Sequence, residues 1–111
     1  MILAITYDPE DKDVIKSFNN ISYFKIYNIE KNAIIDSSLV KTDGRGHCAL
    51  AGILRRIGVN AMICKELDED ALISLSELGI RVYSGVEGIC DEVAETFAED
   101  INKFQESTVN I

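Results

Sequence analysis

The residues best suited to chemistry lie within positions 42–52, where the only histidine stands beside one of three cysteines. His47 and Cys48 follow two glycines, Gly44 and Gly46, and precede the apolar spacing of an amphipathic helix. Glycine gives a loop backbone angles closed to other residues, and a helix start offers unpaired N–H groups with a partial positive charge. An imidazole, a thiol and free amide donors together suit a soft metal centre or a sulfide-bearing anion.

Each candidate residue also has a structural alternative. His47 is either a ligand or a helix-start histidine bonded to the loop, and Cys48 is either a thiolate ligand or a small buried side chain. Arg45 pairs either with an anionic ligand or with one of the abundant carboxylates. Cys64 ends an apolar strand and is either a ligand or a core residue, because free cysteines are often buried. Cys90 begins a helix expected behind the sheet, so we expect its sulfur to pack there as a small apolar group.

Three carboxylates suggest a different chemistry at the same edge of the sheet. Asp8, Glu66 and Asp68 are expected in neighbouring loops, and such groups hold Mg²⁺ in ribonuclease-H-like nucleases. No basic stretch accompanies them to bind nucleic acid, so solvated acidic loops are the simpler interpretation. A magnesium-dependent nuclease is therefore the third hypothesis.

Composition predicts one compact domain with few classes of partner. The chain has 111 residues, of which 47% are hydrophobic, and a net charge of −8. This acidity disfavours nucleic acid and anionic membranes, and no apolar run approaches the roughly 20 residues of a membrane span. An odd number of cysteines without a secretory signal favours reduced thiols in the cytoplasm. We expect a single domain at residues 1–106, followed by a frayed tail at 107–111.

Hydrophobic periodicity predicts an α/β fold. The strands are expected at residues 2–7, 22–29, 33–40, 59–64 and 80–83, and the helices at 46–57, 69–78 and 90–104. A meander followed by right-handed crossovers predicts a mixed sheet of order 3-2-1-4-5 with the second strand antiparallel. The first two helices should cover one face and the last helix the other. Loops after the first, third, fourth and fifth strands then share one edge, where ligands of open α/β sheets usually bind.

Several segments resemble one known family in both order and spacing. They are residues 5–8 (Ile-Thr-Tyr-Asp), 23–30 (Tyr-Phe-Lys-Ile-Tyr-Asn-Ile-Glu), 46–52 (Gly-His-Cys-Ala-Leu-Ala-Gly), Gly58-Val59, Cys64 and 78–86 (Leu-Gly-Ile-Arg-Val-Tyr-Ser-Gly-Val). Over roughly residues 2–104 the chain resembles the dinitrogenase iron–molybdenum cofactor biosynthesis family. Members are small ribonuclease-H-like domains that carry or insert metal–sulfur clusters. The family usually has Gly-His-Gly at positions 46–48, so Cys48 replaces a glycine.

The resemblance implies a non-enzymatic cytoplasmic protein that binds or carries an iron–sulfur or molybdenum–iron–sulfur species. The implied metal ligands are His47, Cys48 and Cys64, the last at the family's own cysteine position. Gly44, Arg45 and Gly46 would form the cofactor-binding loop. Proteins that donate or accept the cluster are the implied partners.

Two departures from the family pattern favour a second hypothesis. Members commonly have His-Phe-Gly-His before the second strand, where this chain has Ser-Phe-Asn-Asn at 17–20. Many also have Cys-Gly-Gly-Ile-Gly after the fourth strand, where residues 64–68 are Cys-Lys-Glu-Leu-Asp. Carboxylates repel an anionic cluster, and the lost glycines restrict close approach of the backbone. The alternative is a member without bound metal that serves as a protein-interaction or regulatory module.

Overall fold

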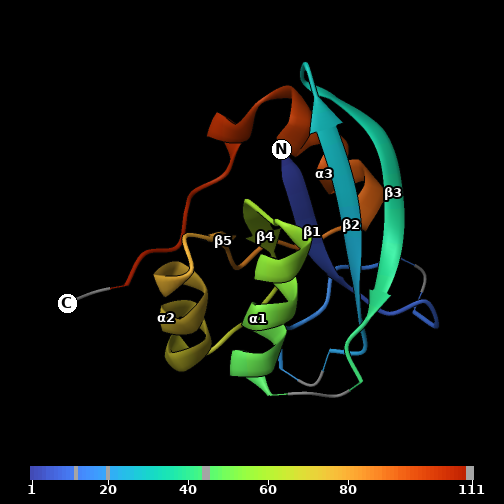
Figure 1. Cartoon of the computed structure of the whole chain (residues 1–111). Coiled ribbons are helices and arrows are strands. Elements are labelled where there is room, and N and C mark those ends of the chain that lie inside the picture. Colours follow the sequence, from blue (N-terminus) through green and yellow to red (C-terminus); the bar gives the residue numbers. More distant parts are fainter. Residues whose placement is uncertain (12, 20, 44–45, 110–111) are drawn as a thin grey trace.

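The computed structural model describes residues 1–11, 13–19, 21–43 and 46–109, which form an α/β fold (Figure 1). Within these residues the strands are β1 (Ile2–Tyr7), β2 (Tyr23–Glu30), β3 (Ala33–Lys41), β4 (Ala61–Ile63) and β5 (Arg81–Tyr83). The helices are α1 (His47–Ile57), α2 (Glu69–Glu77) and α3 (Cys90–Glu99), followed by the 3-10 turn η1 (Ile101–Lys103). The predicted fold class is confirmed.

The strands form one mixed sheet in the predicted order β3-β2-β1-β4-β5. β2 pairs antiparallel with both of its neighbours, whereas β1, β4 and β5 are parallel. Lys31 and Asn32 join β2 to β3 and have positive φ angles of 51° and 63°. A two-residue hairpin turn whose twist matches that of the strands requires such angles. α1 carries the chain from the edge strand β3 across to β4, so β1 lies at the centre of the sheet.

A hydrophobic core lies on each face of the sheet. On one face α1 and α2 pack against the sheet, with Leu54 and Leu75 fully buried. On the other face α3 packs with Phe97 buried. Consecutive β1 residues alternate between these cores, since Ala4 belongs to the first and Ile5 to the second. The predicted placement of the helices is confirmed.

The last helix is shorter than its apolar spacing predicts. Asp100 takes an extended backbone, with φ −153° and ψ 95°, and its carboxylate accepts a hydrogen bond from the Asn102 N–H at 3.0 Å. This side-chain bond competes with continuation of the helix, so α3 ends at Glu99. Phe104 still packs edge-on against Phe97, with ring centroids 5.2 Å apart. The apolar stripe is therefore kept although the helix is not.

The segment after η1 runs back along the outer edge of β5. The Ser107 N–H donates to the Val82 carbonyl at 2.7 Å, and the Ser84 N–H donates to the Ser107 hydroxyl at 3.0 Å. Ser107 is thus held by the sheet, while residues 110–111 of the expected tail lie outside the described residues. In the part of the chain that the structure describes, no helix is long and apolar enough to cross a membrane.

Candidate functional site

The candidate site lies at the edge of the sheet where β1, β3, β4 and β5 end, at the bottom of Figure 1. The loops that begin at this edge lead to β2, α1, α2 and α3. Because β1, β3, β4 and β5 point the same way, segments far apart in sequence meet there. This arrangement is the one predicted from the strand order.

A segment of the first loop, residues 13–18, lies across this edge. The Lys16 carbonyl accepts hydrogen bonds from the Thr6 hydroxyl and from the Lys65 N–H, the latter at 3.0 Å. The Phe18 N–H donates to the Glu66 carbonyl at 2.7 Å. Val14 forms an isolated antiparallel bridge with Ile89. We call residues 13–18 the covering segment, because it links the end of β1 to the residues that follow β4 and to those at the start of α3.

Cys64 lies in the core next to this edge. Its side chain is 0% exposed and belongs to the same cluster as Phe18 and Phe24, whose rings lie 5.9 Å apart. Burial raises the pKa of the Cys64 thiol to about 12. The thiolate is the form that binds metal, so the folded chain holds Cys64 in the form that does not.

Cys48 has a different environment, in the first turn of α1. It is exposed, and its sulfur lies 3.8 Å from the hydroxyl of Ser74 on α2. The Cys48 sulfur therefore lies at the surface on the α1 side of the sheet, whereas the Cys64 sulfur lies in the core on the same side. Among the described residues, an added Cβ at Gly46 would meet nothing within 4 Å, so the backbone before Cys48 is open. Gly46 caps the helix with φ −70°, an angle that other residues also adopt.

Three of the predicted site residues lie partly or wholly outside the part of the chain that the structure describes. His47 is the first residue of α1, and its side chain lies outside the described part. Gly44 and Arg45 lie outside the described residues altogether. Their roles in ligand binding stay predictions.

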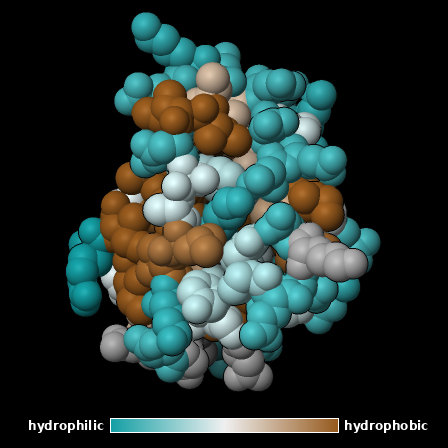
Figure 2. Space-filling view, turned by 90° about the vertical axis from the view of Figure 1, so that its right-hand side faces the viewer, coloured by the Kyte–Doolittle hydropathy of each residue, from teal (hydrophilic) through white to brown (hydrophobic). Residues whose placement is uncertain are grey.

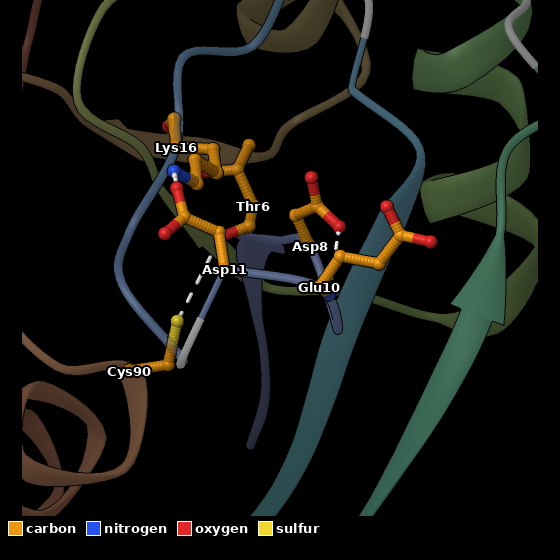
Figure 3. A network of polar contacts seen from close by, with 6 residues as sticks. All are labelled: Thr6, Asp8, Glu10, Asp11, Lys16 and Cys90. Carbon is orange, nitrogen blue, oxygen red and sulfur yellow. Dashed lines mark hydrogen bonds and ion pairs between the residues drawn. The ribbon is translucent and has the colours of Figure 1, made fainter.

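Cys90 lies behind the sheet, as predicted. It is 0% exposed in the α3 core, and its thiol donates a weak hydrogen bond to the Thr6 carbonyl at 3.7 Å (Figure 3). Burial raises the pKa of the Cys90 thiol to about 12. The sheet separates it from the core of Cys64.

Three of the acidic side chains at the edge, Asp8, Asp11 and Asp68, have local partners. Asp11 pairs with Lys16, and Asp8 accepts a hydrogen bond from the Glu10 N–H at 3.0 Å (Figure 3). Asp68 caps α2 by accepting from the Ala71 N–H at 2.9 Å. Among the described residues, no three histidine, cysteine or carboxylate side chains gather as metal ligands. The carboxylates that would serve a nuclease therefore do not form its metal site in this conformation.

Sequence analysis missed a polar cluster that ties the covering segment and α3 to the sheet. The Lys25 ammonium lies 2.8 Å from Asp91 and over the rings of Tyr7 and Tyr27. The Tyr27 hydroxyl donates to Asp91 at 2.7 Å, and the Tyr7 hydroxyl donates to Asp13. The bonds from Lys25 and Tyr27 lower the pKa of Asp91, whereas the bond to Asp13 raises the pKa of Tyr7 to about 12. The available sequence signal was the spacing of Lys25 and Tyr27, which are two residues apart and therefore lie on one face of β2.

The three cysteines are expected to differ sharply in reactivity. In the native protein at pH 7, iodoacetamide should label Cys48, while Cys64 and Cys90 react at least roughly tenfold more slowly, because they are buried and protonated. Mass spectrometry of peptides from a time course checks this. Denatured protein, in which all three should react alike, is the control. Native labelling of Cys64 at the rate of Cys48 would contradict the burial described above.

Solved structures share this fold over nearly their whole length. A putative dinitrogenase from Methanocaldococcus jannaschii is 26% identical, with a TM-score of 0.75 and coverage of 99% of this chain and 97% of that one. A putative NifB protein from Thermotoga is 23% identical (TM-score 0.73, coverage 99% and 96%). The apo form of the orange protein from Desulfovibrio gigas is 16% identical (TM-score 0.78, coverage 97% and 93%). The last two show likeness of fold alone.

Sequence comparisons place the chain in a family. The search of curated protein sequences gave no match. The family model for the dinitrogenase iron-molybdenum cofactor matches residues 1–100, nearly the whole of the described fold. The chain therefore belongs to the dinitrogenase iron-molybdenum cofactor family.

Proposed function

We propose that this protein binds and carries an iron–sulfur or molybdenum–iron–sulfur species without catalysing a reaction. The proposed binding surface is the start of α1, where His47 and Cys48 would be the ligands and Gly44, Arg45 and Gly46 the surrounding loop. The observation that carries the proposal is the exposed thiol of Cys48 in the first helical turn, at the edge where sheets of this kind bind ligands. Membership of the family supports the same class of cargo.

The first helical turn adds donors other than the side chains. Unpaired N–H groups and the positive end of the helix dipole favour an anionic ligand, and a sulfide-bearing cluster carries negative charge. α1 has no acidic residue in its first turn that would oppose this. The open space above Gly46 leaves room for such a ligand to approach the backbone.

Cys64 would take part only after a local rearrangement. As a ligand its thiol must lose a proton and become accessible, and both steps require the covering segment to leave the edge. We therefore propose Cys64 as a third ligand of an opened form, with His47 and Cys48 making the first contact. Two protein ligands hold a cluster less tightly than three, which suits cargo that is passed between a donor and an acceptor protein in the cytoplasm.

Anaerobic reconstitution tests this proposal. Wild-type protein incubated with iron and sulfide and then desalted should retain both and become coloured. Cys48→Ala should retain several-fold less, whereas Cys90→Ala, the matched control with a buried cysteine on the other face, should retain as much as wild type. Negligible and equal metal and sulfide in all three proteins would contradict the proposal.

A second candidate function is a metal-free interaction or regulatory module. It is favoured by the burial of Cys64 and by the lack of gathered ligands among the described residues. The carboxylates of Glu66 and Asp68, in place of the family's glycine loop, also favour it. If reconstitution leaves wild type and both variants without metal, the result would favour this second function over cluster carriage.

A further inference from the structure

The covering segment, residues 13–18, places one apolar side chain in each core of the sheet. Ile15 belongs to the core on the α3 side and Phe18 to the core on the α1 side, and each is 1% exposed. Other apolar side chains are covered less well, since Ile35 and Leu39 of β3 are 55% and 48% exposed. Figure 2 views the side of the molecule on which β3 lies, and hydrophobic patches appear there among hydrophilic ones. The covering segment therefore straddles the edge of the sheet with a buried anchor on either face.

The first half of the covering segment is bonded to the start of α3. The Cys90 N–H donates to the Asp13 carbonyl at 2.7 Å, and the Ile15 N–H donates to the Gly88 carbonyl at 3.0 Å. The Asp13 carboxylate also accepts a hydrogen bond from the Tyr7 hydroxyl at the end of β1. Cys90 is 0% exposed and belongs to the same core as Ile15. These contacts hold the first half of the covering segment beside Cys90.

The second half of the covering segment is bonded to the residues that follow β4. The Phe18 N–H donates to the Glu66 carbonyl at 2.7 Å, and the Lys65 N–H donates to the Lys16 carbonyl at 3.0 Å. Cys64, the residue before Lys65, is 0% exposed in the core that contains Phe18. The same short segment thus lies beside one buried thiol on each face of the sheet.

Thr6, near the end of β1, connects the two halves. It is 0% exposed, its hydroxyl donates to the Lys16 carbonyl, and its own carbonyl accepts from the Lys16 N–H at 3.4 Å and from the Cys90 thiol at 3.7 Å (Figure 3). If Lys16 moved away, it would leave polar groups of a buried residue without their partner. Ile15 and Phe18 are three positions apart, at most about 11 Å of extended chain, so neither anchor leaves its core without pulling on the other.

We propose that the covering segment opens as one unit and thereby exposes Cys64 and Cys90 together, so that access to each thiol is set from both faces of the sheet. Small cooperative units of this kind open at a lower free energy than the whole domain. The proposal rests on the contacts of the covering segment and needs no bound cluster. For the cluster carriage proposed above, it follows that loosening the start of α3 frees Cys64 as a third ligand, and this consequence alone rests on the proposed function.

Reciprocal alkylation of the two thiols, in protein without metal, tests this coupling. Ile15→Ala removes the anchor on the α3 side and should raise the native alkylation rate of Cys64, on the other face, at least about tenfold. Phe18→Ala should likewise raise the rate of Cys90 at least about tenfold. Ile29→Ala is the matched control, because it removes the same groups from the same core but lies outside the covering segment. Comparison with the free energy of unfolding of each variant separates local from global opening.

A milder variant serves if Ile15→Ala does not fold. Tyr7→Phe keeps the ring and removes only the hydroxyl that donates to Asp13. Loss of this one hydrogen bond should raise the alkylation rates of Cys64 and Cys90 by about threefold each. An unchanged rate at Cys64 in Tyr7→Phe would contradict the coupling.

Two results with the alanine variants would overturn the proposal. In the first, Ile15→Ala exposes only Cys90 and Phe18→Ala exposes only Cys64, so that the two halves of the covering segment are independent covers. In the second, the rates in Ile29→Ala equal those in Ile15→Ala at the same loss of stability, so that the thiols are reached only by global unfolding. Failure of cluster reconstitution leaves both comparisons unchanged, because they use protein without metal.

Discussion

Replacing Phe18 with alanine is expected to make Cys64 reactive while leaving the rest of the sheet folded. Phe18 is 1% exposed and is the apolar anchor of the covering segment against Phe24. Truncating a buried phenylalanine costs about 3–5 kcal/mol, a large part of the stability of a small domain. Phe18 is the buried apolar residue of the covering segment on the Cys64 side, because Ile15 packs in the core of the other face, so part of this cost should appear as local opening beside Cys64.

The measurement is the native alkylation rate of Cys64 in Phe18→Ala, which should rise at least tenfold above that of wild type. Phe97→Ala is the matched control, because Phe97 is 2% exposed and packs on the opposite face. It should lower the free energy of unfolding by a similar amount without a selective increase at Cys64. Equal protection of Cys64 in Phe18→Ala and wild type would show that the covering segment does not control access.

A second large effect is expected at alkaline pH. The thiols of Cys64 and Cys90 have their pKa values raised from 9.0 to about 12 by burial. Above pH 9 the unfolded chain loses these protons while the folded chain keeps them, so stability is lost as pH rises from 9 towards 12. Each thiol contributes about 1.4 kcal/mol per pH unit in that window. The pair therefore contributes a loss of roughly 5 kcal/mol between pH 9 and 11.

Chemical denaturation at a series of pH values measures this loss. The double variant Cys64→Ala/Cys90→Ala lacks both groups and should show a shallower fall in the free energy of unfolding above pH 9. Tyr7, whose pKa is raised to about 12, remains in both proteins and cancels in the comparison. Parallel curves for the two proteins between pH 9 and 11 would show that burial does not disfavour the charged forms of the two thiols.

The fold could be predicted from the sequence because its signals are local. Alternation in β2, the helical spacing that Gly58 ends, and the turn at Lys31 and Asn32 each specify an element from a few neighbouring residues. The strand order then follows from the handedness of the crossovers. The end of α3 was not predictable in this way, because the apolar stripe continues to Phe104 while the Asp100 backbone leaves the helix.

The candidate site was less predictable, because it depends on contacts between distant segments. Whether Cys64 is a ligand or a core residue depends on Phe18 and Lys16, which lie more than 40 positions earlier in the chain. The covering segment is short, and the spacing of Val14, Ile15 and Phe18 does not specify its path across the sheet edge. Ile15 and Phe18 are both buried but belong to the cores of opposite faces, an arrangement that depends on the folded sheet.

The most direct test of the proposed function is the alkylation of Cys48 in loaded and unloaded protein. Samples reconstituted anaerobically with iron and sulfide, and matched samples without them, would be treated briefly with iodoacetamide and analysed by mass spectrometry. Binding at the start of α1 predicts that Cys48 is labelled readily in unloaded protein and is protected at least tenfold in loaded protein. Retention of iron and sulfide with Cys48 labelled at the same rate in both samples would contradict this account.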